Sequence, residues 1–141
     1  MEISFIFLDV SAFFNDTATT EIYTSGDTLS LHDALPIYRL TELDFLEFPG
    51  DATVSAEVTA PPAWDLNLMG RRDSVRIAVQ VLSGAVEIPG DTEVVGVFAA
   101  RGSAVLGEGT VPRGAVGLQS GGGRVEAPDG PVVLFTVTHL T

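Results

Sequence analysis

Cysteine and lysine are absent from the 141 residues, and histidine occurs only twice. Without cysteine the chain has no disulfide bond, no thiolate zinc site and no cysteine nucleophile. A sustained 3.6-residue apolar period, which would predict an amphipathic helix, is also missing. The apolar run Met1–Phe14 carries no basic residue, so it lacks the charged start of a signal peptide. It is too short for a membrane-spanning helix, which needs roughly 20 residues.

Basic residues are scarce: seven arginines stand against 19 acids. Six of these acids precede Tyr38, so residues 38–141 have 13 acids against the seven arginines and a net charge of −6. An acidic surface disfavours binding to nucleic acid and to anionic membranes. Because no targeting segment is recognisable, we expect a cytoplasmic protein with neither of these partners.

Residues 15–37 have neither a helical nor an alternating apolar period. Read backwards into codons, Asn15–Thr24 and Thr28–Ile37 match the two constant arms of a short-read sequencing adapter. The reading frame limits the residue after the variable tag to Asp, Asn, His or Tyr, and it is Asp27. The last adapter base must open the next codon, and Tyr38 satisfies that condition. We interpret this segment as translated adapter, which has to be excluded from reasoning about the fold.

This interpretation divides the chain into two parts. Residues 1–37 are an artefactual or disordered leader, and Met1–Phe14 comes from DNA upstream of the adapter. Residues 38–141 are the natural part, which we expect to begin inside a domain and to represent a fragment. We expect the leader to add nothing to the stability of this part.

The natural part consists of short β-type runs separated by Gly, Pro and Asp. Strands are predicted at 53–58, 74–82, 93–100, 103–107, 114–119, 124–127 and 131–140. Turns are predicted at 49–51, 89–91, 120–123 and 128–130. Four apolar residues alternate along the second strand and predict one apolar face: Val75, Ile77, Val79 and Val81. Several strands at about 8–12-residue spacing predict an all-β antiparallel sandwich or barrel.

The densest polar cluster is the segment PPAWDLNLMGRRD. A carboxylate, an amide and two guanidinium groups can bind a small acidic or polar ligand, because guanidinium grips a carboxylate with two hydrogen bonds. The candidate ligand-binding residues are Asp65, Asn67, Met69, Arg71 and Arg72. The alternative is that Asp65 pairs with one of the arginines and only fastens the loop.

The two adjacent arginines cannot share one role in an extended segment, since neighbouring side chains point to opposite faces. A regular strand through Gly70 puts Arg71 on the same face as Asp65 and Asn67, whereas a bulge at Gly70 breaks this parity. On the regular arrangement Arg71 faces the ligand and Arg72 pairs outward.

The stretch FLEFPGDATVSAEVTAPPAWDLNLMGRRDSVRIAVQVL resembles the second half of the HutD/Ves family of small bicupin-like β proteins. It has an F-x-G-D element at Phe48, Gly50 and Asp51, and a D-[FL]-N-[LV]-M-x-R-R motif over 65–72. The second motif is fairly specific, and the resemblance covers residues 38–141. It implies a cupin-like fold, of which this chain holds the C-terminal half.

The resemblance also implies a non-catalytic, small-molecule-binding protein. HutD members accompany histidine-utilisation genes and are connected with sensing a pathway intermediate such as formylglutamate; Ves members are linked to stress or cold responses. The family's W-R-x-S and F-S-x-F-P-G-x-x-R elements do not occur in the sequence. We therefore expect part of the ligand pocket to be missing and this chain to show no measurable binding.

Two other functions are compatible with the residues. An acidic β-sandwich interaction module needs no ligand site, and its arginine pair is structural. A metal-dependent cupin enzyme needs two or three histidines and a glutamate as ligands. His32 lies in the adapter-like segment, and His139 alone cannot form such a site. We expect no cofactor, no metal and no catalytic residue, and an acidic metabolite as partner.

Overall fold

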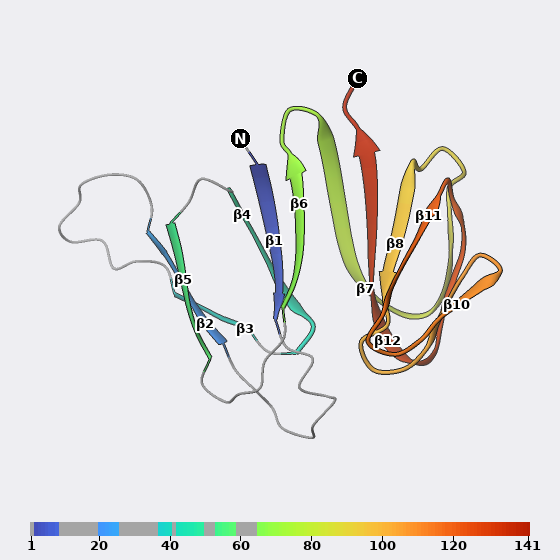
Figure 1. Ribbon diagram of the computed structural model, residues 1–141, viewed down its shortest axis with the longest axis horizontal. Coiled ribbons are helices and arrows are strands. Elements are labelled where there is room, and N and C mark those ends of the chain that lie inside the picture. The colour runs from blue at the N-terminus through green and yellow to red at the C-terminus, as the bar shows by residue number, and fades with distance from the viewer. Residues whose placement is uncertain (1, 9–19, 26–36, 41, 50–52, 59–64) are drawn as a thin grey trace. The chain divides into compact units, whose positions relative to one another are not determined.

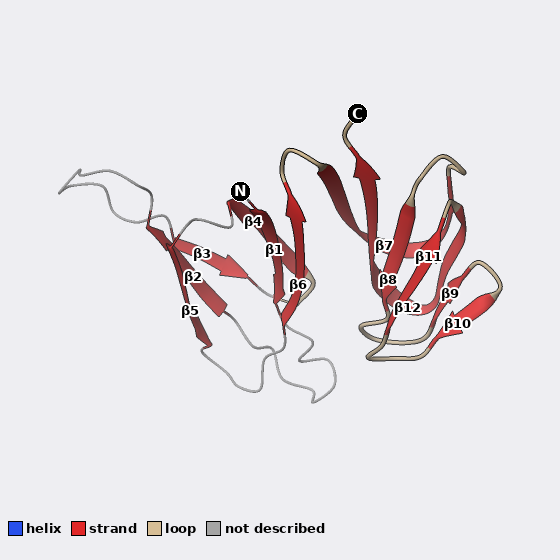
Figure 2. Ribbon diagram, turned by 45° about the horizontal axis from the view of Figure 1, so that its top comes forward, coloured by secondary structure: helices blue, strands red, loops and turns tan. Residues whose placement is uncertain are grey.

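The computed structural model describes residues 2–8, 20–25, 37–40, 42–49, 53–58 and 65–141. These residues form strands β1 to β12 with antiparallel pairing, and none of them lies in a helix (Figure 2). The predicted all-β antiparallel class is confirmed. Within these ranges there is accordingly no helix long and apolar enough to cross a membrane. The chain divides into two compact units, Met1–Arg72 and Asp73–Thr141.

The first unit contains two three-stranded sheets, with the strand orders β4-β1-β6 and β3-β2-β5. The strands are β1 Glu2–Leu8, β2 Thr20–Ser25, β3 Ile37–Leu40, β4 Asp44–Pro49, β5 Thr53–Val58 and β6 Asp65–Arg71. Figure 1 shows β1 between β4 and β6. The middle strand of each sheet therefore comes from residues 1–37 and pairs with a neighbour on both sides.

Both middle strands lie in the segment that we interpret as an artefactual leader. A leader can occupy such positions because β pairing uses main-chain N–H and C=O groups, which every residue except proline supplies in full. The pairing of β1 and β2 shows where their backbone lies. The adapter interpretation concerns the origin of the DNA that encodes residues 15–37, and it stays a prediction. The predicted boundary between 37 and 38 also stays a prediction; the compact units meet at Arg72 and Asp73.

The second unit is a single six-stranded sheet that curls on itself (Figure 1). Its strands are β7 Val75–Ile88, β8 Val94–Phe98, β9 Ala104–Leu106, β10 Gly109–Val111, β11 Val116–Ser120 and β12 Gly123–His139. β12 is the central strand: β7 follows one of its edges throughout, while β9 and then β8 pair with the other. β10 extends the sheet beyond β9, and β11 extends it beyond β8.

The partner change on β12 falls at an irregularity. The register between β12 and β7 shifts between Ala127 and Val132, so extra residues bulge out of the strand. Within this bulge Asp129 accepts a hydrogen bond of 2.6 Å from the hydroxyl of Ser103, in the turn between β8 and β9. The bulge thus marks the corner at which β12 leaves one partner and meets the next.

The predicted turn at 128–130 is wrong, because the chain does not reverse there. The runs predicted as separate strands, 124–127 and 131–140, join into the single strand β12. Proline, aspartate and glycine are typical of bulges as well as turns, and Gly130 has a positive φ of 137°. The other predicted strands are confirmed as β5, β7, β8, β9 and β11.

Two of the other predicted turns, at 89–91 and 120–123, are confirmed. At 89–91 the turn is closed by a hydrogen bond of 3.1 Å from the N–H of Thr92 to the carbonyl of Pro89. At 120–123 the chain turns from β11 into β12, and Gly121 adopts a φ of 77° that favours glycine. The predicted turn at 49–51 lies largely outside the described residues.

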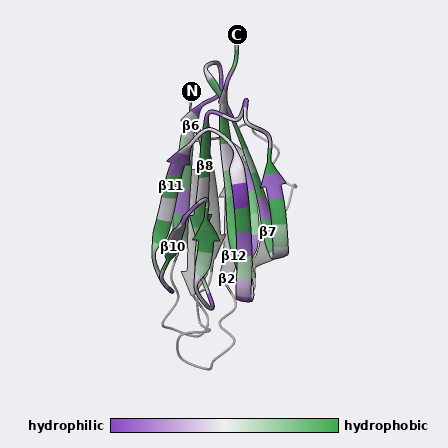
Figure 3. Ribbon diagram, turned by 90° about the vertical axis from the view of Figure 1, so that its right-hand side faces the viewer, coloured by the Kyte–Doolittle hydropathy of each residue, from purple (hydrophilic) through white to green (hydrophobic). Residues whose placement is uncertain are grey.

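The core of the second unit lies on one face of its curled sheet. It consists of ten buried side chains: Val95, Val97, Ala99, Ala104, Leu106, Val111, Val125, Ala127, Val132 and Leu134. Hydrophobic residues along β8 are visible in Figure 3. From Val132 to Phe135 β12 is buried on both faces, which explains why this part of the sequence is continuously apolar instead of alternating.

β7 changes its buried face midway. In its first half, Val75, Ile77 and Val79 are half-buried on one face, as their alternation predicts. Val81 has the same parity but is 42% exposed. In the second half the core is contacted by apolar residues of the opposite parity: Leu82, Val86 and Ile88.

Gly96 is the residue of β8 that faces Phe135 across the ladder. A Cβ atom at this position would overlap the ring of Phe135, so the aromatic ring covers the glycine directly. Gly117 on β11 is similarly enclosed, because its missing Cβ leaves space that Val111 fills. Both glycines are required by close packing.

Candidate functional site

The segment that carries the candidate ligand-binding residues forms β6, an edge strand of the sheet β4-β1-β6. The antiparallel pairing of β6 with β1 has no register shift. It runs from Asp65, opposite Leu8, to Arg71, opposite Glu2. The strand is therefore regular through Gly70, and no bulge breaks its parity. This was the condition for Arg71 to share a face with Asn67.

Exposure alternates along β6 with a period of two. Asn67, Met69 and Arg71 are exposed, and Met69 exposes 66% of its surface. Leu66 and Leu68, on the opposite face, are half-buried. We call the face that carries the first three residues the motif face. Its side chains are open to a ligand from solvent, whereas the leucines attach the strand to the fold.

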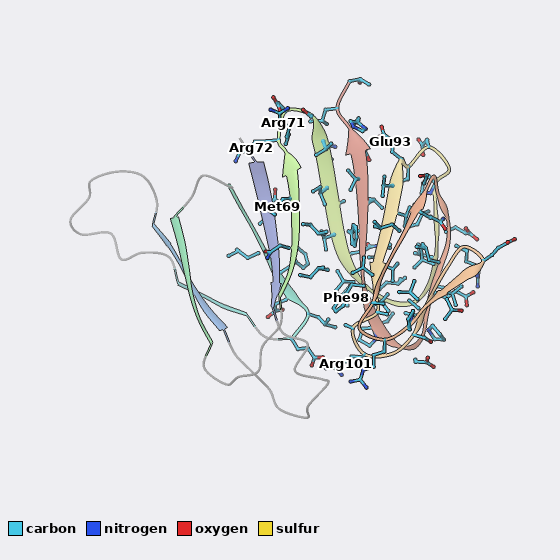
Figure 4. The ribbon with its side chains drawn as sticks, in the orientation of Figure 1. Met69, Arg71, Arg72, Glu93, Phe98 and Arg101 are labelled. Carbon is cyan, nitrogen blue, oxygen red and sulfur yellow. The ribbon has the colours of Figure 1, made fainter. Side chains whose placement is uncertain are left out.

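Arg71 and Arg72 occupy the end of β6, as Figure 4 shows. Arg71 is the last residue of the strand, and Arg72 begins the turn that leads to β7. Both are exposed, and neither has an ion-pair partner among the side chains that the structure describes. Two exposed guanidinium groups are therefore present, and only Arg71 continues the alternation of the motif face.

The structure brings four of the five predicted residues into one short exposed stretch and places the backbone of Asp65 at its start. The side chain of Asp65 lies outside the described part, so its suggested pairing with an arginine stays a prediction. Asn67 already makes an interaction of its own in the structure. Gly50 and Asp51 of the F-x-G-D element also lie outside the described residues.

Sequence reasoning missed the strand that pairs with β6. In the ladder Ser4 lies opposite Met69, and Ile6 lies opposite Asn67. No signal in the sequence points to this pairing, because it joins segments that are far apart in the chain and one of them was assigned to the leader.

In the second unit Glu93 and His139 form an exposed polar contact. The carboxylate of Glu93 accepts a hydrogen bond of 3.1 Å from the backbone N–H of His139 through Oε1, and its Oε2 is hydrogen-bonded to the Nδ1 atom of the same residue. The contact with the His139 ring, followed by the backbone bond, lowers the pKa of the Glu93 carboxyl. Among the described residues no three His, Cys, Asp or Glu side chains gather as a metal site would require.

Comparisons with known proteins agree with the motif. The family model described as HutD matches residues 13–121, so the match begins upstream of the region over which the resemblance was expected. No curated protein matches the chain. Among solved structures, HutD from Pseudomonas fluorescens SBW25 (formate condition) is similar, with a TM-score of 0.76 and 17% sequence identity over 99% of this chain and 70% of that chain.

At this low identity the structural likeness shows the fold alone, and it confirms the predicted cupin-like all-β fold. The family match is evidence of a different kind, because it rests on the sequence and spans more than half of the residues. The chain therefore belongs to the HutD family.

Proposed function

We propose that this chain carries the motif face of a HutD-family ligand site, which senses an acidic intermediate of histidine or other amino-acid catabolism. The observation that carries the proposal is the motif face: Asn67, Met69 and Arg71 are exposed side by side on a regular strand. The guanidinium of Arg71 can bind a carboxylate with two hydrogen bonds, and Asn67, four residues away on the same face, can contact another part of the ligand. Family membership supports the connection with histidine utilisation.

Arg71 and Arg72 have different roles in this proposal. Arg71 ends the strand on the motif face and binds the carboxylate of the ligand directly. Arg72 stands in the following turn and leaves the alternation, so it contributes only through its charge. A charge-assisted hydrogen bond stabilises a complex by about 1.5–3 kcal/mol, whereas a distant exposed charge contributes much less.

Calorimetric titration with N-formylglutamate tests the proposal. The protein for this test is a HutD-family member that has both the W-R-x-S element and the D-[FL]-N-[LV]-M-x-R-R motif. Alanine at the position of Arg71 should weaken binding by about 1.5–3 kcal/mol, and alanine at the position of Arg72 should change it little. The neutral side-chain amide of the same probe serves as a control and should bind poorly.

The chain itself should give no measurable heat in the same titration, because the W-R-x-S element is not in its sequence. Equal losses of binding free energy in the two arginine variants would show that the position of Arg71 on the motif face gives it no special role in binding. Binding that survives both substitutions would remove the site from β6 altogether and favour the alternative of an interaction module.

A further inference from the structure

β11 is an edge strand of the six-stranded sheet in the second unit. It pairs with β8 along Val116–Ser120, and no other strand of the described residues pairs with it. The sheet has two further edges, at β7 and β10. β10 has only three residues, and β7 carries the exposed charges of Arg76 and Glu87. β11 has neither a charged residue nor a proline, the residues with which proteins usually prevent pairing at an edge.

Two hydrogen bonds on either side of β11 show which of its main-chain groups point away from β8. The carbonyl of Ala115 accepts a bond of 3.1 Å from the N–H of Ala99, just before the strand. Just after it, the N–H of Gly121 donates a bond of 3.0 Å to the carbonyl of Glu93. Bonded residues alternate along an antiparallel ladder, so the odd-numbered residues of β11 face β8. The N–H and C=O groups of its three even-numbered residues therefore point to the free edge.

The side chains of the even-numbered residues lie on the face of β11 that is turned away from the core, which we call the outer face. Gly117 belongs to the other face, where a Cβ atom would meet Val111 of the core. On the outer face Val116 is 46% exposed and Leu118 is 65% exposed. Phe135 lies on the same face with one glycine of β8 between it and Leu118, and it is only 4% exposed. Burial on the outer face thus decreases from β12 to the edge at β11.

We propose that β11 is a self-association edge, at which a second copy of this chain adds its own β11 in antiparallel orientation. Two-fold symmetry about Leu118 places Leu118 opposite its own copy, and Val116 opposite Ser120 of the second copy. All three residues direct their main-chain groups outward, so each facing pair exchanges two hydrogen bonds. The joined strands extend the apolar outer face from one copy into the other.

A second copy suits this edge because the strand is its own complement. In a two-fold arrangement the same patch meets itself, so a charge near the axis would face a like charge. β11 has no charge, and its most exposed apolar side chain, Leu118, lies at the axis. The outward groups of one strand all find partners on the reversed strand in a single register. This proposal does not depend on the ligand site proposed for β6.

The absence of cysteine allows the second copy to be trapped by a disulfide bond. Leu118→Cys places its sulfur at the two-fold axis, where facing Cα atoms are about 5.5 Å apart and a disulfide can form. Val116→Cys is the matched control on the same face, because the two copies of this residue are about 13 Å apart along the strands. In an oxidising glutathione buffer Leu118→Cys should form a covalent dimer roughly tenfold faster than Val116→Cys.

Mixing chains that carry Val116→Cys with chains that carry Ser120→Cys completes the pattern. These two positions face each other in the proposed register, so the mixed dimer should form at the faster rate. Equal rates for Leu118→Cys and Val116→Cys, or no dimer from either the Leu118→Cys chain or the mixture, would overturn the proposal.

Sedimentation velocity tests the main-chain part of the proposal without a crosslink. A five-residue strand gives a small interface, so association should be weak and should increase with protein concentration. Leu118→Pro removes an N–H that points to the free edge and leaves the bonds to β8 in place, so this chain should stay monomeric. Leu118→Ala keeps the N–H and should still associate. Association that Leu118→Pro does not reduce would contradict the proposal, and if this variant does not fold, the cysteine variants decide.

Discussion

The two units of this chain are both built from antiparallel strands, but they differ in where their strands obtain partners. Every strand of the second unit pairs within residues 73–141, and ten buried side chains form a core there. In the first unit the middle strand of each sheet comes from the predicted leader. The comparison separates a sheet whose strands all come from residues 73–141 from sheets whose middle strands come from the predicted leader.

The difference can be measured strand by strand. Hydrogen exchange of β1 and β6 follows unfolding of the first unit, while hydrogen exchange of β8 and β12 follows the second. A chain with two units need not unfold in one step, so separate probes are necessary.

The largest effect is expected from Leu134→Ala. Leu134 is 1% exposed and belongs to the core of the second unit, so its truncation should cost about 2–5 kcal/mol. A unit of this size has a total stability of about 3–10 kcal/mol, so the variant should be close to unfolding. Urea unfolding followed by hydrogen exchange of β12 measures the loss.

The matched control is Leu118→Ala on β11, where the leucine is 65% exposed. This variant should change the free energy of unfolding by less than about 0.5 kcal/mol. Hydrogen exchange of β1 and β6, in the first unit, should be the same in both variants. Similar losses at Leu134 and Leu118 would show that the core is not where the structure places it.

A smaller effect is expected from Gly96→Ala. The added methyl group has no space beneath the ring of Phe135, and overpacking of this kind costs about 1–3 kcal/mol. The double variant with Phe135→Ala removes the obstacle, so the two substitutions should be less than additive. Strict additivity in thermal unfolding would contradict the direct contact.

The smallest effect concerns acid stability at the end of β12. The hydrogen bonds from His139 lower the pKa of Glu93 in the folded state, below the value of about 4.3 for an unfolded chain. The stabilisation is therefore fully present above about pH 4.3 and is lost as the pH falls through the lower folded pKa. Glu93→Gln cannot titrate, so its stability should fall less steeply than that of the parent chain in this acid range.

Urea unfolding at a series of pH values measures this difference. Both partners are exposed, so the effect should be small and should decrease as salt is added. The charged residues on neighbouring elements, Asp73, Arg76 and Asp91, are present in both chains and cancel in the comparison. Parallel pH profiles for the two chains would show that the contact with His139 does not contribute.

Much of the second unit could be predicted from its sequence, because its signals are local. Alternating β-branched residues identify β7, and glycine with proline identifies the turn before β8. The failure at 128–130 has a physical reason: the same residue types serve a turn and a bulge, and only the neighbouring strands decide between them. The change of buried face along β7 likewise depends on packing against other strands, which the periodicity of the sequence does not show.

The candidate site could be predicted in part. A period of two correctly anticipates that Asn67, Met69 and Arg71 share a face, because side chains alternate on any regular strand. The regularity at Gly70 could not be predicted, since glycine is compatible with a bulge. The pairing of β6 with β1 could not be predicted either, because strand register between distant segments is set by the whole sheet.

Hydrogen exchange of the full chain and of a chain comprising 38–141 tests the central difference between the units most directly. Peptides that cover β8 and residues 132–137 should exchange equally slowly in both chains, because their core lies within the second unit. Peptides that cover β6 should exchange faster in the shorter chain, because β1 is the one strand that pairs with β6 in the described part of the protein. These ladders limit the expectation that the leader adds nothing to stability to the second unit. Unchanged exchange of β6, or faster exchange throughout the second unit, would contradict this account.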